Sequence, residues 1–599
     1  MVASREMRAI RELPLVAPLA LAGLAVFFGG GPGNGSIMWL GGGALVTLLA
    51  LLVTRGAPGG FIALLPLAAL VAWLALSITW STLPDRSWDY ADRGLVYLLF
   101  AALGLWLASR TRELALGLCV LLGAVVVWSL AGKVLPFVHD YGPPDVARLS
   151  APVGLWNQLA LLADFALPLA LWRRGRSGTL LAYGWLVALV LTYSRGGLLT
   201  AILVLAAWFL LTDERLESAA TLLAAAVPAG VVVAIAFALP GVTSDGESLH
   251  ARWHDGLIFG ALLLLGAVAA AWLARLPRPR VTTALLRGLV ACGVVAVVAV
   301  VVFVVVKGGG SGAVGNGGGR IASTSSNFRF AWWRQALDGW QHHNLLGTGA
   351  GTFNLSNLRY RSSYVDFTIE PHNLPLQFLT ETGIVGLAAF LLAAAALLRG
   401  SLRRHGHELA LALVLPAYLV HSLVDVDWDF VAVSATAFLV AGALVGRPGL
   451  RRVSPFAALA AAGAALLAFG ALFLPWLGER WSAQATVALS PQHAMTLAKR
   501  ARSVDPLLVE PLLTLGFASD LQNRLLDARA YYAEAVRAQP KNPEPLRLAG
   551  LFELNHGCPR HAYAYLEPFT ELDPQERQDK GGDAYRRARD LVNTGKPIC

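Results

Sequence analysis

Arginine and histidine side chains supply the chemistry that this sequence suggests. Arg195, Arg329 and Arg334 each lie beside an apolar run, and His372 opens another run that carries Glu381 about two turns further on. Arginine binds pyrophosphate through paired hydrogen bonds that survive partial desolvation. A neutral histidine can take a proton from an attacking hydroxyl near pH 7. The combination predicts a site where a hydroxyl attacks an anionic, lipid-linked substrate at a membrane surface.

Each of these residues also has a simpler interpretation. Arg195 can be an interfacial anchor, and His372 can cap its helix. His421 and Asp425 lie four residues apart on one helix face, as a zinc pair would, but no third ligand is evident. Glu381 is harder to explain in this way, because a carboxylate within a membrane span is costly and usually serves a polar cavity. Asp164 within an earlier run invites the same argument.

The composition is that of a membrane protein. Of 599 residues, 56% are hydrophobic and 14% are charged, and the mean hydropathy is +0.58; soluble domains carry about 25% charged residues. The net charge of +10 does not indicate a nucleic-acid partner, because the arginines cluster in short loops between apolar runs. Four cysteines are too few for a disulfide scaffold and none has metal-ligand spacing, so we predict no special role for them.

Apolar runs long enough to cross about 30 Å of hydrocarbon recur along the chain up to about residue 477. Alternating them from a cytoplasmic N-terminus puts 20 arginines in cytoplasmic loops and six basic residues in short outer loops. This asymmetry fits the positive-inside rule and supports the cytoplasmic N-terminus. The apolar runs predict an all-α bundle of about 12–15 spans in a bacterial cytoplasmic membrane. The predicted segments are N-terminal spans at 1–306, an outer loop at 307–371, C-terminal spans at 372–477 and an extracytoplasmic tail at 478–599.

Within the outer loop, residues 307–319 read as a flexible glycine-rich linker. This stretch lacks the Gly-Lys-Ser/Thr ending of a nucleotide-binding loop, so we expect no phosphate site there. Residues 327–340 follow as an amphipathic helix whose aromatic side chains suit a membrane interface. A tight glycine-rich turn then leads towards His372.

The tail carries a repeat. Pro506, Pro540 and Pro574 are spaced by 34 residues, and the same interval separates Gly516 from Gly550. Thirty-four residues is the period of tetratricopeptide helix pairs, in which small residues let the helices pack closely. The tail is therefore predicted to be a helical repeat domain that either holds a protein partner in its groove or serves as a scaffold.

Taken in order, the motifs resemble those of the bacterial O-antigen ligase and polymerase superfamily over roughly residues 60–450. The motifs are Arg148 with Asn157, Ser194-Arg195-Gly196, Arg329-x-x-Trp332, Gly347-x-Gly349-x-Gly351-Thr-Phe353, His372-Asn373, Glu381-x-Gly383-x-x-Gly386 and His421-x-x-x-Asp425. Members commonly have fewer spans, and the glycine-rich insert at 308–319 is unusual for them.

The resemblance implies a metal-independent, inverting glycosyl transfer on the outer membrane face, without a cofactor. The donor would be a glycan on undecaprenyl pyrophosphate, and the acceptor a hydroxyl on a glycan, lipid or protein. Arg195 and Arg329 would hold the pyrophosphate, and His372 would activate the acceptor. The resemblance and the charge pattern indicate five further candidates for substrate binding, namely Arg148, Arg334, Glu381, His421 and Asp425. Polymerase, ligase and protein-modifying activities all stay open.

Two other function classes remain. A transporter or flippase for lipid-linked oligosaccharides would place charged residues along a pathway to both faces, whereas the candidates here gather at the outer end. A non-catalytic membrane anchor that presents the repeats to an envelope assembly complex would leave the buried polar residues without a role.

Overall fold

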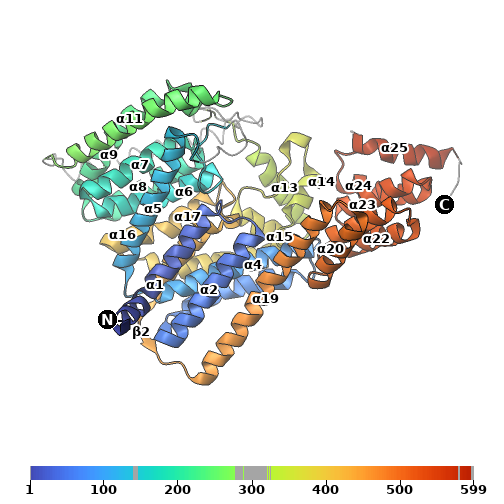
Figure 1. Ribbon diagram of the computed structural model, residues 1–599, viewed down its shortest axis with the longest axis horizontal. Helices are drawn as coiled ribbons and strands as arrows, with labels where there is room; N and C mark the ends of the chain where they lie inside the picture. The colour runs from blue at the N-terminus through green and yellow to red at the C-terminus, as the bar shows by residue number, and fades with distance from the viewer. Residues whose placement is uncertain are drawn as a thin grey trace. The chain divides into compact units, whose positions relative to one another are not determined.

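A computed structural model describes residues 2–138, 146–276, 325–577 and 580–594, together with Gly288, Arg320 and Ser323. The predicted span at 288–306 and the glycine-rich linker at 308–319 lie outside these residues. In the described part, helices make up nearly all of the regular structure (Figure 1).

The chain forms two compact units, and each unit draws on segments that are distant in sequence. Unit 1 comprises residues 1–67, 96–328 and 392–463, and unit 2 comprises residues 68–95, 329–391 and 464–599. Each unit therefore combines parts of several of the four consecutive segments that the sequence predicts. In particular, the tail falls in one unit with the second half of the outer loop and with the chain around residues 68–95.

Unit 1 is a bundle of apolar helices. Its elements are α1 (Val2–Phe27), α2 (Asn34–Arg55), β1 (Ala57–Gly59), α5 (Thr111–Val134), α6 (Trp156–Arg173), α7 (Gly175–Leu191), α8 (Arg195–Leu211), α9 (Arg215–Ala236), α10 (Pro240–Thr243), α11 (Leu249–Leu273), α16 (Gly406–Ala412), α17 (Val414–His421), α18 (Val431–Val445) and β2 (Arg447–Arg451). Strands β1 and β2 pair antiparallel. The core lies around α6 and α18, whose side chains are buried on nearly every face.

Unit 2 holds shorter helices and the tail. Its own helices are α13 (Arg329–His342), α14 (Phe353–Tyr360), α20 (Pro491–Val504), α21 (Glu510–Leu521), α22 (Leu525–Ala538), α23 (Pro543–Asn555), α24 (Pro559–Leu572) and α25 (Lys580–Asn593). Four longer elements are shared across the division, namely α3 (Leu65–Ser77), α4 (Pro84–Leu105), α15 (Leu374–Leu398) and α19 (Pro455–Thr486).

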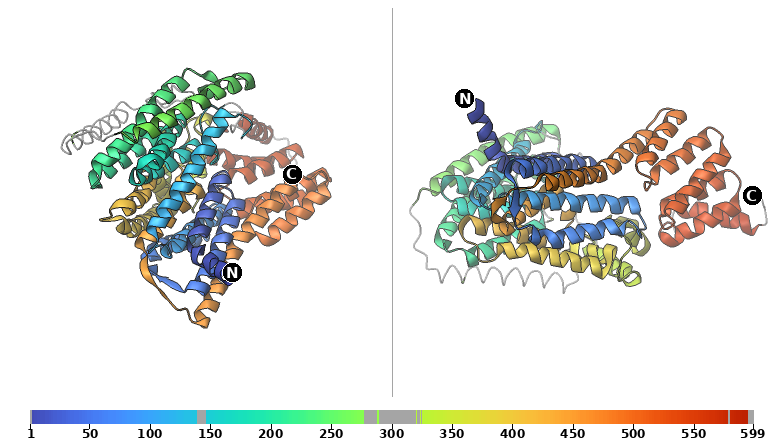
Figure 2. Two further views of the ribbon diagram at one scale, coloured as in Figure 1. Left: turned by 60° about the vertical axis from the view of Figure 1, so that its left-hand side comes forward. Right: turned by 90° about the horizontal axis from the view of Figure 1, so that it is seen from below.

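Consecutive tail helices from α20 to α25 pack against one another (Figures 1 and 2). A Cβ on Gly550 of α23 would lie 2.5 Å from the side chain of Leu566 on α24, so a small residue is needed where these helices meet. Phe569, which occupies a small-residue position of the repeat pattern, is buried in the same cluster. The close packing expected of small residues is present at this pair, while the assignment to the tetratricopeptide family stays a prediction.

Six of the described helices are long and apolar enough to cross a membrane by length and composition. They are Asn34–Arg55, Thr111–Val134, Arg215–Ala236, Leu249–Leu273, Leu374–Ser401 and Pro455–Thr486, and six shorter apolar helices accompany them. The predicted class, an all-α polytopic membrane protein, is confirmed. The figure of about 12–15 spans stays a prediction.

Candidate active site

His372 lies in a turn just before α15, with its ring against an aromatic wall. The ring stacks on the indole of Trp332 at a centroid distance of 4.8 Å and an interplanar angle of 21°. Its backbone has φ +52°, a left-handed conformation that costs energy in a non-glycine residue and clusters at functional sites. The Oδ1 of Asn373 accepts a hydrogen bond from the backbone N–H of Leu376 at 3.0 Å, so Asn373 caps the helix by the usual route. The half-buried imidazole is therefore not needed as the cap.

Helix α13 presents Trp332 to this histidine. Trp332 is 6% exposed, and its indole N–H donates to the backbone oxygen of Asp366 at 2.7 Å. Arg329 precedes Trp332 by three residues, so the two project from the same side of the helix, whereas Arg334 follows by two and is exposed on the other side. Of the two arginines that flank the tryptophan pair, the helix thus places Arg329 on the face of the histidine wall.

A buried amide fixes α13 to α14. The Nδ2 of Asn357 donates to Oε1 of Gln335 at 2.8 Å and to the backbone oxygen of Asp366 at 3.1 Å. Asp366 also receives the Trp332 indole, so one short network holds the wall behind His372 in place. The sequence signal for it was weak, because single Asn and Gln residues in helices are common and nothing in their spacing links them.

The carboxylate of Glu381 holds the glycine-rich turn that precedes α14. Its oxygens accept hydrogen bonds from the backbone N–H groups of Gly351 at 2.8 Å and Phe353 at 3.2 Å, and its backbone oxygen accepts from Gly349 at 2.8 Å. Gly349 has φ +108°, and a Cβ there would lie 2.1 Å from Oγ of Ser81, which explains the glycine. Glu381 is 3% exposed, so the geometry makes it a positioning residue, and direct contact with substrate stays a prediction.

The start of α4 adds polar groups that sequence reasoning did not select. The Tyr90 hydroxyl donates to Oε1 of Glu370 at 3.0 Å and accepts from Nε2 of Gln377 at 3.0 Å. Arg86 lies 3.6 Å from the same carboxylate oxygen. From the sequence, Arg86 is only one of the six basic residues of the short outer loops, because nothing near it in the sequence relates it to residues almost three hundred positions later.

Four of the predicted site residues belong to unit 1. Arg148 is 2% exposed, and its Nε donates to the backbone oxygen of Thr192 at 2.9 Å. Its guanidinium lies 3.9 Å from the ring centroid of Trp156, and its Nη2 donates to Oδ1 of Asn157 at 3.3 Å. Asn157 in turn donates through Nδ2 to the Asp425 carboxylate. The spacing of Arg148 and Asn157 thus marks a real side-chain pair, and the pair continues to Asp425.

His421 does not pair with Asp425. Its Nδ1 lies 2.9 Å from both carboxylate oxygens of Asp427, a residue that sequence reasoning missed, and Ser422 donates to the same carboxylate at 2.9 Å. Among the described residues, His421 and Asp425 have no third side chain beside them that would complete a metal-ligand group. A Cβ on Gly196 would lie 3.6 Å from Nε2 of His421, so the Ser-Arg-Gly turn packs directly against this imidazole.

Arg195 is the first residue of α8. The preceding Ser194 caps the helix by accepting the backbone N–H of Gly197 at 3.1 Å. The Arg195 guanidinium donates through Nη1 to the backbone oxygen of Ser323. The candidate residues therefore divide between two groups: Arg148, Arg195, His421 and Asp425 in unit 1, and Arg329, Arg334, His372 and Glu381 in unit 2.

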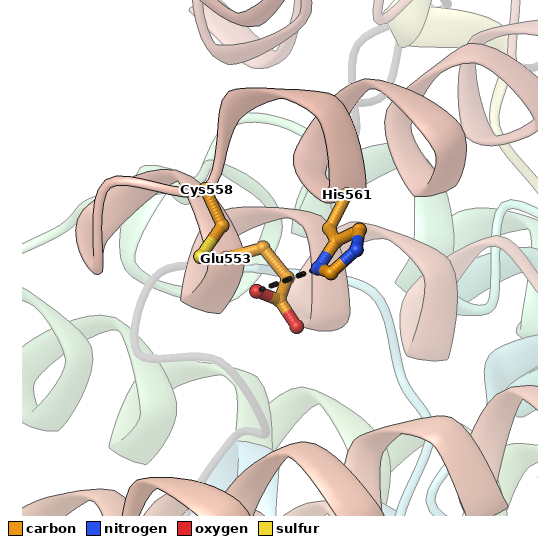
Figure 3. Close-up of side chains that lie close together, drawn as sticks. All are labelled: Glu553, Cys558 and His561. Carbon is orange, nitrogen blue, oxygen red and sulfur yellow. Dashed lines mark ion pairs between the residues drawn. The ribbon is translucent and has the colours of Figure 1, made fainter. Parts of the chain in front are cut away.

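One cluster in the tail has the residue types of a metal site. Glu553, Cys558 and His561 place one ligand atom each within 4.8 Å of one another (Figure 3). However, Arg529 donates to both oxygens of the Glu553 carboxylate, at 2.6 and 2.8 Å, and neutralises it. The Cys558 sulfur is part of a disulfide, so it is no thiolate ligand. The cluster therefore ties α22 to α23 and α24, and the disulfide corrects our prediction that no cysteine has a special role.

Comparison with known family models gives a match over part of the chain. Residues 256–391 match the family model described as O-Antigen ligase. The matched segment contains Arg329, Arg334, His372 and Glu381, and it supports placing the chain in the O-antigen ligase superfamily. No curated protein matches the chain. The family match and the apolar helices together support a membrane protein of surface-polysaccharide biosynthesis with a glycan-transfer function.

Proposed function

We propose that this protein is a metal-independent, inverting glycosyltransferase that transfers or polymerises a glycan from an undecaprenyl-pyrophosphate donor. The observation that carries the proposal is His372, which is held in a left-handed turn against Trp332 on the Arg329 face of α13. Both residues lie inside the segment that matches the O-antigen ligase family. The acceptor is a hydroxyl of a glycan, lipid or protein.

In the proposed reaction, the neutral imidazole of His372 takes the proton of the acceptor hydroxyl. The acceptor oxygen then forms a bond to the anomeric carbon of the donor, while the bond from that carbon to the pyrophosphate oxygen breaks on the opposite face. The configuration therefore inverts. Arg329 neutralises the charge that develops on the leaving pyrophosphate. The resemblance assigns Arg195 to the same anion, and we keep that assignment as a separate proposal to be tested by its own variant.

We further propose that the reaction and the tail both lie outside the cytoplasm. Within unit 2, Arg361 of the outer loop forms an ion pair of 2.6 Å with Asp573 of the tail, so loop and tail share one side of the membrane. Disulfides persist in oxidising compartments and are rare in the cytosol. The disulfide at Cys558 therefore supports an extracytoplasmic tail, in agreement with the charge pattern of the loops.

The test is transfer by the purified protein in nanodiscs, with a polyprenyl-pyrophosphate oligosaccharide as donor, in the presence of EDTA. Products are separated by length on a gel, with and without an added acceptor. We expect His372→Ala and Arg329→Ala each to reduce transfer at least about 100-fold, the lower end of what general-base and charge-stabilising groups contribute. A ladder of lengthened lipid-linked chains indicates a polymerase, and product that needs a second acceptor indicates a ligase.

Two variants serve as controls. His493→Ala removes an exposed histidine of the tail, and Arg500→Ala removes an exposed arginine of α20. Both are expected to retain transfer. Full activity in His372→Ala and Arg329→Ala would refute the site, and loss of activity in EDTA would refute metal independence.

A further inference from the structure

A cavity of about 580 Å³ lies where the outer loop meets the tail, entirely within unit 2. Its walls come from α14 on one side and from α23, α24 and the start of α25 on the other. Its volume lies within the range of pockets that bind small organic ligands. Figure 1 shows α14 next to the tail helices that close the cavity.

Two hydrogen-bond acceptors in this wall are left without a partner among the described residues. The Oδ1 of Asp573 and the Oδ1 of Asn354 are both buried and receive no hydrogen bond. Asp573 is only 4% exposed, and its other oxygen is taken by Arg361 at 2.6 Å. A buried acceptor without a donor costs about 1–3 kcal/mol, so these two atoms point to a ligand that brings donors.

The wall also holds donors, and some of them are engaged. The Nδ2 of Asn542 donates to Oε1 of Gln539 at 2.7 Å. The guanidinium of Arg547 donates to both carboxylate oxygens of Glu544, at 2.7 and 2.8 Å. Glu544 takes two of the five N–H groups of Arg547, so this guanidinium keeps further donors, and Glu576 adds a carboxylate. The wall thus offers both acceptors and donors. A ligand group that can both donate and accept hydrogen bonds fits such a wall.

Sugar hydroxyls are such groups, because each hydroxyl donates one hydrogen bond and accepts others through its lone pairs. The remaining wall is apolar, with Leu355, Leu358 and Leu551 among its residues, and can contact the C–H face of a sugar ring. We propose that this cavity binds sugar residues of the glycan acceptor. Naming the ligand as the acceptor rests on the proposed function, whereas the hydroxyl-binding chemistry does not.

Helix α14 connects the cavity to the candidate active site. Its residue Asn354 faces the cavity, and Asn357, three positions later, belongs to the network behind Trp332 and His372. A glycan held in the cavity therefore contacts the same short helix that supports the histidine. This arrangement suits a site that retains the acceptor chain while its end is extended.

The experiment measures binding without catalysis. Oligosaccharides are released from the envelope polysaccharide of the strain that carries this chain, fractionated by size and titrated onto the full-length protein in nanodiscs. Asn354→Leu removes the acceptor atom at similar size, Asn354→Asp retains it, and Leu551→Trp fills the cavity. The matched control is Leu526→Trp, which adds the same indole to α22 away from the cavity, at a residue that is 79% exposed.

We expect the wild type, Asn354→Asp and Leu526→Trp to bind alike. Asn354→Leu is expected to bind about fivefold more weakly, the factor of one net hydrogen bond, and Leu551→Trp not to bind. Equal binding by all variants, or no binding by the wild type, would overturn the proposal, and so would capture of a peptide through this cavity. Because transfer is assayed separately, a wild type that transfers glycan but does not bind here would refute the cavity and leave the proposed function standing.

Discussion

Replacing Glu381 by glutamine separates a positioning role from direct contact with substrate. The carboxylate accepts two backbone N–H groups at the start of α14, from Gly351 at 2.8 Å and Phe353 at 3.2 Å. Glutamine has one oxygen where glutamate has two, so Glu381→Gln can accept only one of these N–H groups. Its NH₂ group then faces the other donor.

The size of the effect follows from these contacts. A hydrogen bond to a charged group contributes about 1.5–3 kcal/mol, and a negative charge near a helix N-terminus adds about 0.3–1 kcal/mol. We therefore expect Glu381→Gln to destabilise the protein by about 2–4 kcal/mol, which corresponds to a lower unfolding midpoint by on the order of 5–10 °C. Transfer activity should fall in parallel, because the displaced turn leads into the helix that supports Trp332.

The assay is intrinsic tryptophan fluorescence during heating at a fixed rate, together with the transfer assay on the same preparation. Glu571→Gln, an exposed carboxylate on α24, is the matched control and should change neither quantity. An unchanged midpoint with complete loss of transfer would refute the reasoning and return Glu381 to the substrate-binding residues. An unchanged midpoint with unchanged transfer would mean that the two N–H contacts contribute nothing.

The remaining predictions concern pH and backbone conformation. Burial, with the nearby Glu510 and Asp89 carboxylates, raises the pKa of Asp85 from 3.8 to about 7. The folded protein therefore binds more protons than the unfolded chain between these values, so its stability falls as pH rises through this window, and Asp85→Asn should flatten the dependence of the midpoint on pH. Gly349→Ala should lower the midpoint and the transfer rate, because φ is +108° and the new methyl group would lie 2.1 Å from a serine oxygen; Gly463→Ala, at a helical position with open space, should change neither.

The sequence allowed prediction of features that depend on local pattern. Helix α13 with its aromatic face, the glycine-rich turn and the helical tail all follow from spacing and composition over a few residues. The relation of Arg329 and Arg334 to Trp332 also follows from the helical period, once the helix is accepted. Local pattern thus predicted the elements that carry the candidate residues of unit 2, and the roles of those residues stay predictions.

Roles that depend on distant partners were not predictable in this way. His421 pairs with Asp427 rather than Asp425 because α17 ends at His421. The residues after it therefore no longer follow the helical spacing that the sequence analysis assumes. The backbone partners of the Glu381 carboxylate were not predictable, because they lie about thirty residues earlier in a turn of unusual conformation. The disulfide at Cys558 had no local signal, since four scattered cysteines do not indicate pairing.

The ion pair between Arg361 and Asp573 affects how deletions of the tail should be interpreted. The two side chains are 5% and 6% exposed, and Gln575 donates to the backbone oxygen of Arg361 at 3.2 Å. Replacing Asp573 alone would cost about 3–5 kcal/mol, because Arg361 would stay buried without its partner. A truncation of the tail instead removes the pair and exposes the loop surface around Arg361, so loss of activity in such a strain does not by itself measure what the tail binds.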